Sequence, residues 1–229
     1  MIGANGDELA GDLELSIVGV AARERDDGAL DVLINTSRGE LTGVLHPCEG
    51  EPGAAVFVGG ALGGLDGPAN ALYPRLAADL AARDAAGISG LRLHYRQPGE
   101  FEECVMDVLG GIAFLKGLGA RRVALVGHSF GAAVAIKAGE LSELVAGVAA
   151  LSPQTYGTRS VAKLAPRPLL LVHGTADSAL DAEASRQIHE RAVEPKRLVL
   201  YQGAGHSLRS HADELFALLR DWLVDVVAG

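Results

Sequence analysis

Short apolar runs alternate along the chain with longer segments in which apolar residues recur at helical spacing. Runs of about four to eight apolar residues predict strands, and apolar residues three and four apart predict one buried face of a helix. Strands are expected at residues 13–20, 30–35, 40–46, 54–58, 90–93, 123–126, 147–151, 169–172 and 198–201. Helices are expected at residues 69–86, 101–118, 130–141, 181–192 and 208–227. From the fourth run onward, strands and helices therefore mostly alternate.

Such alternation is typical of an α/β domain with a mostly parallel sheet of about eight strands and helices on both faces. The later apolar runs are continuous stretches of Val, Leu and Ala, as expected for strands covered on both faces. The first three runs are separated by Asp26-Asp27-Gly28 and Ser37-Arg38-Gly39, which predict turns between antiparallel strands at one edge. Because no internal repeat or low-complexity linker is visible, residues 1–229 are expected to form a single domain.

The composition fits one large core and argues against two classes of partner. Apolar residues make up 48% of the chain, which is enough for a sizeable core. The formal net charge is −9, whereas a nucleic-acid-binding surface needs clustered Lys and Arg. No run approaches the ~20 apolar residues of a membrane span, and residues 1–14 lack the basic and apolar regions of a signal peptide. We expect a soluble cytoplasmic protein with reduced Cys48 and Cys104 and no nucleic-acid or membrane partner.

A candidate nucleophile lies in Gly127-His128-Ser129-Phe130-Gly131, which matches the pattern G-x-S-x-G. In this motif a serine occupies a sharp turn between a strand and a helix, and the turn leaves so little space that glycines flank it. The strand predicted at 123–126 leads directly into the motif, and the helix predicted at 130–141 follows it. This context favours a nucleophilic Ser129 over a glycine-rich turn with an idle serine.

An activated serine needs a histidine that accepts its proton and a carboxylate that orients the histidine. In proteins with this motif, the acid and then the base follow the serine along the chain, and each lies after a later strand. Asp177 follows the strand predicted at 169–172, and His206 lies in a glycine-rich segment after the strand predicted at 198–201. Asp181 is an alternative acid, although its position is better explained as a helix N-cap. The other histidines are more typical of local hydrogen bonds or exposed positions: His46, His94, His128, His173, His189 and His211.

The tetrahedral intermediate of acyl transfer needs two N–H donors for its oxyanion. We expect one donor to be the backbone N–H of Phe130, the residue after the nucleophile, and the other to come from Ala61 in the loop 59–64. This glycine-rich loop could instead cradle a phosphate. However, neither G-x-x-x-x-G-K-[ST] nor an ordered G-x-G-x-x-G follows the strand before it.

Taken together and in order, three motifs resemble those of the α/β-hydrolase superfamily, and the resemblance extends from about Ser37 to the C-terminus. The motifs are Val126-Gly127-His128-Ser129-Phe130-Gly131, His173-Gly174-Thr175-Ala176-Asp177 and Gly203-Ala204-Gly205-His206. The resemblance implies the α/β-hydrolase fold. In two places the chain departs from the family pattern: His94 stands where Asp-Tyr-Arg usually begins, and Gly59-Gly60 replaces His-Gly.

The segment 152–168 is too short for the helical lid that many members insert there. The chain is therefore similar to the compact branch of dienelactone-hydrolase-like proteins and small carboxylesterases. Dienelactone hydrolases proper carry a cysteine nucleophile, whereas Ser129 stands in this chain. Their substrate is for that reason not carried over.

These features predict a serine hydrolase that cleaves a small carboxylic ester or thioester through an acyl-enzyme on Ser129. No metal and no organic cofactor is implied. Without a lid the pocket should be open and shallow, with its lining formed by residues next to the catalytic strand ends: Leu62, Phe130, Gln154, Tyr156 and Leu208. A peptidase or acyltransferase with the same triad, and a non-catalytic small-ligand receptor, remain alternatives because substrate choice depends on pocket shape. The sequence does not indicate an oligomeric state.

Overall fold

The computed structural model of the protein describes residues 14–50, 52–82 and 87–228. Its strands are β1 (Ile17–Glu24), β2 (Leu30–Thr36), β3 (Gly39–His46), β4 (Gly53–Val58), β5 (Ile88–His94), β6 (Arg122–His128), β7 (Val145–Leu151), β8 (Leu169–Gly174) and β9 (Lys196–Tyr201). Its helices are α1 (Pro68–Ala81), α2 (Phe101–Gly117), α3 (Phe130–Leu141), α4 (Glu183–Arg191) and α5 (Ala212–Ala228). Two short 3₁₀ turns complete these ranges, η1 (Val161–Leu164) and η2 (Arg209–His211).

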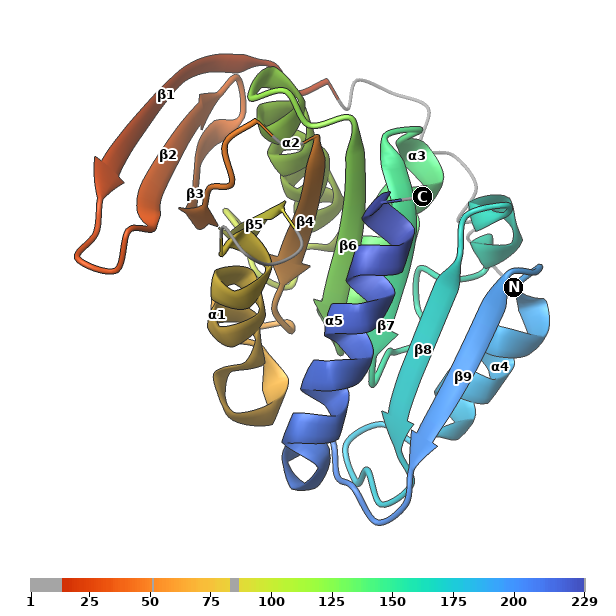
Figure 1. The fold of residues 1–229 in the computed structure, drawn as a ribbon. Coiled ribbons are helices and arrows are strands. Elements are labelled where there is room, and N and C mark those ends of the chain that lie inside the picture. Colours follow the sequence, from red (N-terminus) through yellow and green to blue (C-terminus); the bar gives the residue numbers. More distant parts are fainter. Residues whose placement is uncertain (1–13, 51, 83–86, 229) are drawn as a thin grey trace, which may run out of the picture.

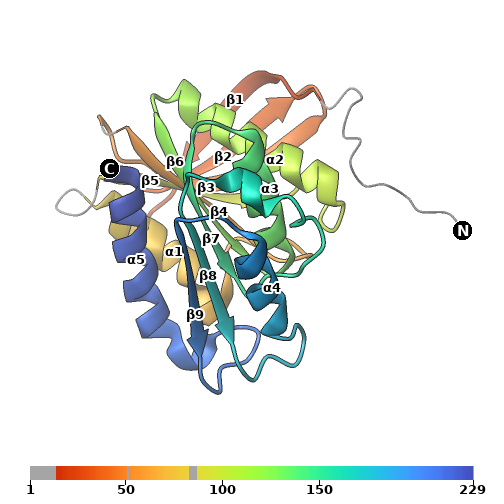
Figure 2. The ribbon, with the colours of Figure 1, turned by 90° about the vertical axis from the view of Figure 1, so that its right-hand side faces the viewer.

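Within the described ranges the nine strands form one sheet in the order β1-β2-β3-β5-β4-β6-β7-β8-β9 (Figure 1). Helices α1 and α5 cover one face, and α2, α3 and α4 cover the other (Figure 2). Strand β4 contributes to both cores, because Val56 packs under α2 and α3 while Phe57 packs under α1. Burial on both faces explains why this strand is apolar throughout instead of alternating.

The last four strands are parallel, so their carboxyl ends lie together on the same side of the sheet. His128 of β6 pairs with Leu151 of β7, which pairs with Val172 of β8. Gly174 at the end of β8 pairs with Tyr201 at the end of β9. The segments that follow these strands, at Ser129, at 152, at 175–177 and at 202–206, must therefore leave the sheet side by side.

Two elements, β1 and the last helix, differ at one end by four residues from their predicted bounds. The sheet has nine strands, one for each of the nine predicted ranges, and β1 runs to Glu24 instead of ending at residue 20. Its pairing continues into the charged residues because the tight turn from Arg25 to Ala29 (N–H to O, 2.8 Å) fixes the register with β2. Residue 13 of the predicted strand and residues 83–86 of the predicted helix lie outside the described residues. The last helix begins at Ala212 instead of 208, because Leu208 has a left-handed φ of 53° and η2 follows it.

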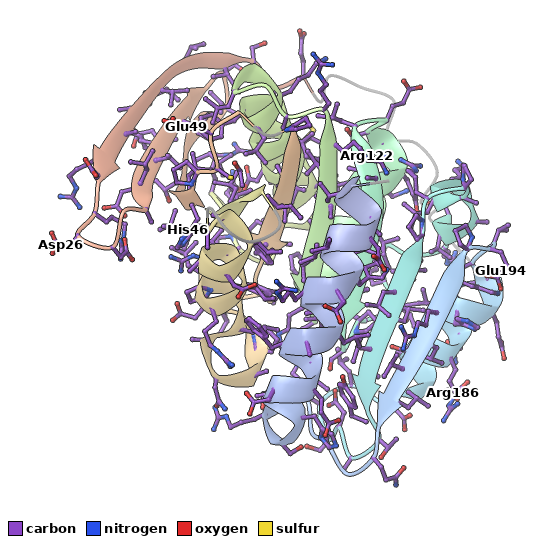
Figure 3. All side chains as sticks on the ribbon, viewed as in Figure 1. Asp26, His46, Glu49, Arg122, Arg186 and Glu194 are labelled. Atoms are coloured by element: carbon purple, nitrogen blue, oxygen red, sulfur yellow. The ribbon has the colours of Figure 1, made fainter. Side chains whose placement is uncertain are left out.

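Charged side chains occupy both outer edges of the sheet. Asp26 lies at the tip of the β1–β2 hairpin, while Arg186 and Glu194 lie beside the other edge, formed by β9 (Figure 3). Along β1, Arg23 donates to Asp31 of β2 at 2.7 Å. Charges of this kind discourage pairing of an edge strand with another chain.

Candidate active site

The turn between β6 and α3 holds Ser129 in a strained backbone conformation. Its φ is 58° and its ψ is −119°, a region that costs on the order of 1–3 kcal/mol for a residue with a side chain. The Ser129 N–H donates to the Leu151 carbonyl at 2.8 Å, which fixes the turn to the end of β7. A Cβ atom on Gly127 would overlap the Gly131 carbonyl, and one on Gly131 would overlap the Gly59 carbonyl. The two glycines of the motif are thus required by close backbone contacts.

Asp177 lies in the turn after β8, with its carboxylate fully buried. Oδ1 accepts the N–H groups of Ala179 at 2.8 Å and Leu180 at 2.9 Å. Oδ2 lies 2.7 Å from Nδ1 of His206 and 3.1 Å from Nε2 of His173. Burial disfavours the charged form, but the hydrogen bonds from the Leu180 N–H, the His206 ring and the Ala179 N–H outweigh it and hold the pKa of Asp177 below its ordinary value. An ionised Asp177 can orient the His206 ring.

His206 lies in the loop after β9, and its side chain is 28% exposed. Since Nδ1 is bound to Asp177, Nε2 is the ring nitrogen left for proton transfer. The backbone carbonyl of His206 accepts hydrogen bonds from Nε2 of His128 at 3.0 Å and from the Ser152 hydroxyl at 3.1 Å. Burial lowers the pKa of His128 to about 4, so its ring remains a neutral donor. His128 and Ser152 thus attach the His206 loop to the ends of β6 and β7, and Ser129 directly follows β6.

Ser129 and His206 are therefore brought to the same edge by their immediate neighbours. The ring centroids of His128 and His206 are 4.8 Å apart. Within the described part of the chain, the Ser129 hydroxyl forms no hydrogen bond with another side chain. In enzymes without a bound substrate such catalytic hydrogen bonds are often long and tighten only in the substrate complex.

The alternative acid and most other histidines have separate local roles. Asp181 accepts the Glu183 N–H at 2.8 Å in the turn directly before α4, whose N-cap is Ala182 and not the predicted Asp181. His94 contacts the Tyr95 carbonyl at 2.9 Å, and His211 stacks on Tyr201. His173 is the exception, because its side chain contacts Asp177 directly.

The loop after β4 lies against the nucleophile turn. A Cβ atom on Gly60 would lie 3.8 Å from Cβ of Ser129. Gly60 and Gly63 pair across a tight turn (N–H to O, 2.9 Å), and Ala61 occupies the turn directly after Gly60. The buried Tyr95 hydroxyl donates to the Gly59 carbonyl at 3.4 Å and holds the start of the loop. This loop and the N-terminus of α3, where Phe130 begins the helix, border Ser129 from two sides.

Aromatic residues line one approach to Phe130. Phe101 packs edge-to-face on Phe130 with centroids 6.0 Å apart, and Tyr156 packs edge-to-face on Phe101 at 5.3 Å. Tyr156 is 64% exposed and Gln154 is partly buried, so both have surface that a substrate can reach. Phe101 was not identified from the sequence, where it reads only as the first residue of a helix.

Two predicted pocket residues differ sharply in exposure. Leu62 is 94% exposed at the tip of the loop after β4. Leu208 is fully buried in the core between α1 and α5, so it presents no surface to a substrate. The prediction that Leu208 lines the pocket is wrong, because the left-handed turn at this residue directs the apolar side chain into the core.

In the part of the chain that the structure describes, no lid lies over the strand ends. Residues 152–168, between β7 and β8, contain only turns and the single 3₁₀ turn η1. In the described ranges, no three or more His, Cys, Asp and Glu side chains gather in a way that could hold a metal ion. None of the helices seen in these ranges is long and apolar enough to cross a membrane.

The chain matches a known protein family over more than half of its length. Residues 70–218 match the family model of the dienelactone hydrolase family. A curated relative, the uncharacterized protein YfhR of Escherichia coli K12, is 31% identical over 87 residues. That match covers 38% of this chain and only 30% of the relative, so the chain matches less than a third of the relative's length.

Solved structures with the same architecture include a dienelactone hydrolase from Anabaena variabilis, with a TM-score of 0.74 and 18% identity over 89% of this chain and 98% of that one. The α/β hydrolase GrgF from Penicillium sp. sh18 has a TM-score of 0.68 and 16% identity over 95% of this chain and 100% of that one. At these identities the likeness concerns the fold. It confirms the α/β-hydrolase fold that the sequence predicts.

Proposed function

The chain belongs to the dienelactone hydrolase family, and on that premise we propose that it is a serine hydrolase cleaving small carboxylic esters or thioesters. The observation that carries the proposal is the 2.7 Å contact between Nδ1 of His206 and the buried, ionised Asp177, next to a serine at a strained strand–helix turn. A buried carboxylate on one imidazole nitrogen leaves the other nitrogen to act as a base.

In the proposed reaction His206 Nε2 removes the hydroxyl proton of Ser129 as Oγ forms a bond to the substrate carbonyl carbon. The backbone N–H groups of Phe130 and Ala61 stabilise the resulting oxyanion. Collapse of the intermediate breaks the ester or thioester bond, and His206 returns the proton to the leaving alcohol or thiol. Water then attacks the acyl-enzyme by the same steps, which releases the carboxylic acid and restores Ser129.

The substrate's acyl group should be short. None of the described residues forms a lid over the site, and the exposed Tyr156 and Leu62 side chains offer little enclosed apolar surface for a long chain. We expect the kcat/KM of the parent protein on p-nitrophenyl esters to be highest for acetate to butyrate and to fall towards decanoate. Steady-state kinetics over the series tests this. A preference for decanoate, or activation by emulsified substrate, would contradict the open pocket, and the absence of both turnover and a burst would favour a receptor.

The oxyanion donors can be tested by removing one N–H group. Ala61→Pro eliminates the N–H of Ala61, and we expect kcat to fall by about 10²–10³-fold, as when one oxyanion donor is lost elsewhere. Ala61→Ser keeps the N–H and should retain kcat close to that of the parent. Both variants are compared by p-nitrophenyl acetate hydrolysis and by thermal unfolding. Equal activity of Ala61→Pro and Ala61→Ser would assign the second donor to another residue.

A further inference from the structure

We propose that His173 is a positioning residue for the hydrolytic reaction, which with Ser185 holds Asp177 in the orientation that serves His206. The inference rests on the proposed function, since Asp177 is the acid of the proposed triad. His173 lies near the end of β8 with a fully buried side chain, four residues before Asp177. A buried imidazole requires hydrogen-bond partners for both ring nitrogens, and in His173 both nitrogens have them.

The contacts of Nε2 determine where the ring proton lies. Nε2 is 3.0 Å from the Leu180 carbonyl and 3.1 Å from Oδ2 of Asp177. A carbonyl and an ionised carboxylate only accept hydrogen bonds, so Nε2 must carry the proton. The ring therefore donates to the same carboxylate oxygen that receives Nδ1 of His206 at 2.7 Å.

Ser185 accounts for the other ring nitrogen. Its hydroxyl lies 2.7 Å from Nδ1 of His173, and the residue is fully buried on α4. With the proton on Nε2, a neutral ring accepts the Ser185 hydroxyl at Nδ1. A hydrogen bond at one nitrogen fixes the tautomer at the other. Ser185 thus keeps His173 as a donor towards Asp177.

The result is a carboxylate with both oxygens fixed. The N–H groups of Ala179 and Leu180 hold Oδ1, and the two imidazoles share Oδ2. Without His173, Oδ2 would keep only His206, and the carboxylate could turn about its Cβ–Cγ bond. Its negative charge would also be less dispersed, which favours the protonated form of the nearby base. Loss of His173 should therefore lower kcat and shift the acid limb of the pH profile upward.

Other titratable groups near His206 do not produce the same signature. The His128 ring, 4.8 Å from that of His206, is neutral in the assay range because burial lowers its pKa to about 4. Asp177 is charged in this range, since its pKa is held below the ordinary value despite burial. A change in the acid limb of a His173 variant then reports on the coupling between Asp177 and His206.

The test compares His173→Leu with His173→Gln. Leu removes the donor, whereas the amide N–H of Gln can occupy the position of Nε2. For p-nitrophenyl acetate between pH 5 and 9, we expect His173→Leu to lose about 10- to 100-fold in kcat, a loss like that seen in metal sites when the hydrogen-bond partner of a ligating residue is removed. Its KM should be unchanged, because His173 does not reach the substrate, and its acid limb should move to higher pH. His173→Gln should recover most of kcat and the parent's acid limb.

Ser185→Ala provides a second variant that deletes only a hydroxyl group. It should lower kcat in the same direction but less. If His173→Leu does not fold, the kcat and the acid limb of Ser185→Ala decide, and thermal unfolding shows that this variant is folded. A folded His173→Leu with the parent's kcat and acid limb would overturn the proposal. So would an equal loss in both His173 variants with an unshifted acid limb, which indicates a purely structural histidine. If the parent itself neither hydrolyses esters nor reacts with a fluorophosphonate, the proposed function fails instead.

Discussion

Ser129→Ala is expected to lower the kcat for p-nitrophenyl acetate by about 10⁶-fold, the size of the loss when a triad nucleophile is removed. Without Oγ no acyl-enzyme forms, and only the oxyanion donors and substrate binding could still accelerate attack by water. The turn at Ser129 is held by backbone contacts of Leu151 and the flanking glycines, so alanine should leave the fold intact. Steady-state hydrolysis and labelling with a fluorophosphonate, both of which require an activated serine, measure the loss.

The matched control is Ser178→Ala, which removes an exposed hydroxyl directly beside Asp177. This variant should hydrolyse and label like the parent. Thermal unfolding of both variants separates loss of chemistry from loss of fold. If Ser129→Ala kept its esterase activity and its labelling, the nucleophile would have to be a different residue, and the proposed mechanism would be wrong.

Much of the fold is predictable because each central strand carries its own signature. Strand β4 is apolar at every position, and helix α3 begins and ends at the predicted residues, Phe130 and Leu141. The errors concern segments whose limits are set by pairing or by one turn. Strand β1 extends through the charged Arg23 and Glu24 because β2 supplies its hydrogen-bonding partners, a condition that hydropathy does not record.

The proposed triad could be located because its members belong to short local motifs that each follow a strand. The residues around it could not, since they depend on where separate strands end. His128 and Ser152 are 24 positions apart in sequence, yet both donate to the His206 carbonyl. Leu208 was misassigned for the same reason. An apolar residue two positions after His206 fits a pocket wall as well as a core, and only packing between α1 and α5 decides.

Asp177→Asn is expected to lower kcat by about 10⁴-fold with little change in KM, because an amide stabilises the wrong tautomer of the base. If the amide oxygen keeps the N–H groups of Ala179 and Leu180, the NH₂ group faces His206. Nδ1 of His206 must then accept a hydrogen bond, which puts the ring proton on Nε2. A protonated Nε2 cannot accept the hydroxyl proton of Ser129. The NH₂ group also meets Nε2–H of His173, a donor–donor contact that should cost about 1–3 kcal/mol of stability.

Asp181→Asn is the control for this substitution, because the amide oxygen of asparagine can accept the same Glu183 N–H and the residue lies outside the His206 contacts. We expect Asp181→Asn to match the parent in kcat, KM and unfolding temperature. The carboxylate of Asp177 stays ionised in the assay range, so the loss in Asp177→Asn should persist at every pH between 6 and 9. If raising the pH restored the parent's kcat, or if Asp181→Asn gave the larger loss, Asp177 would not be the residue that orients His206.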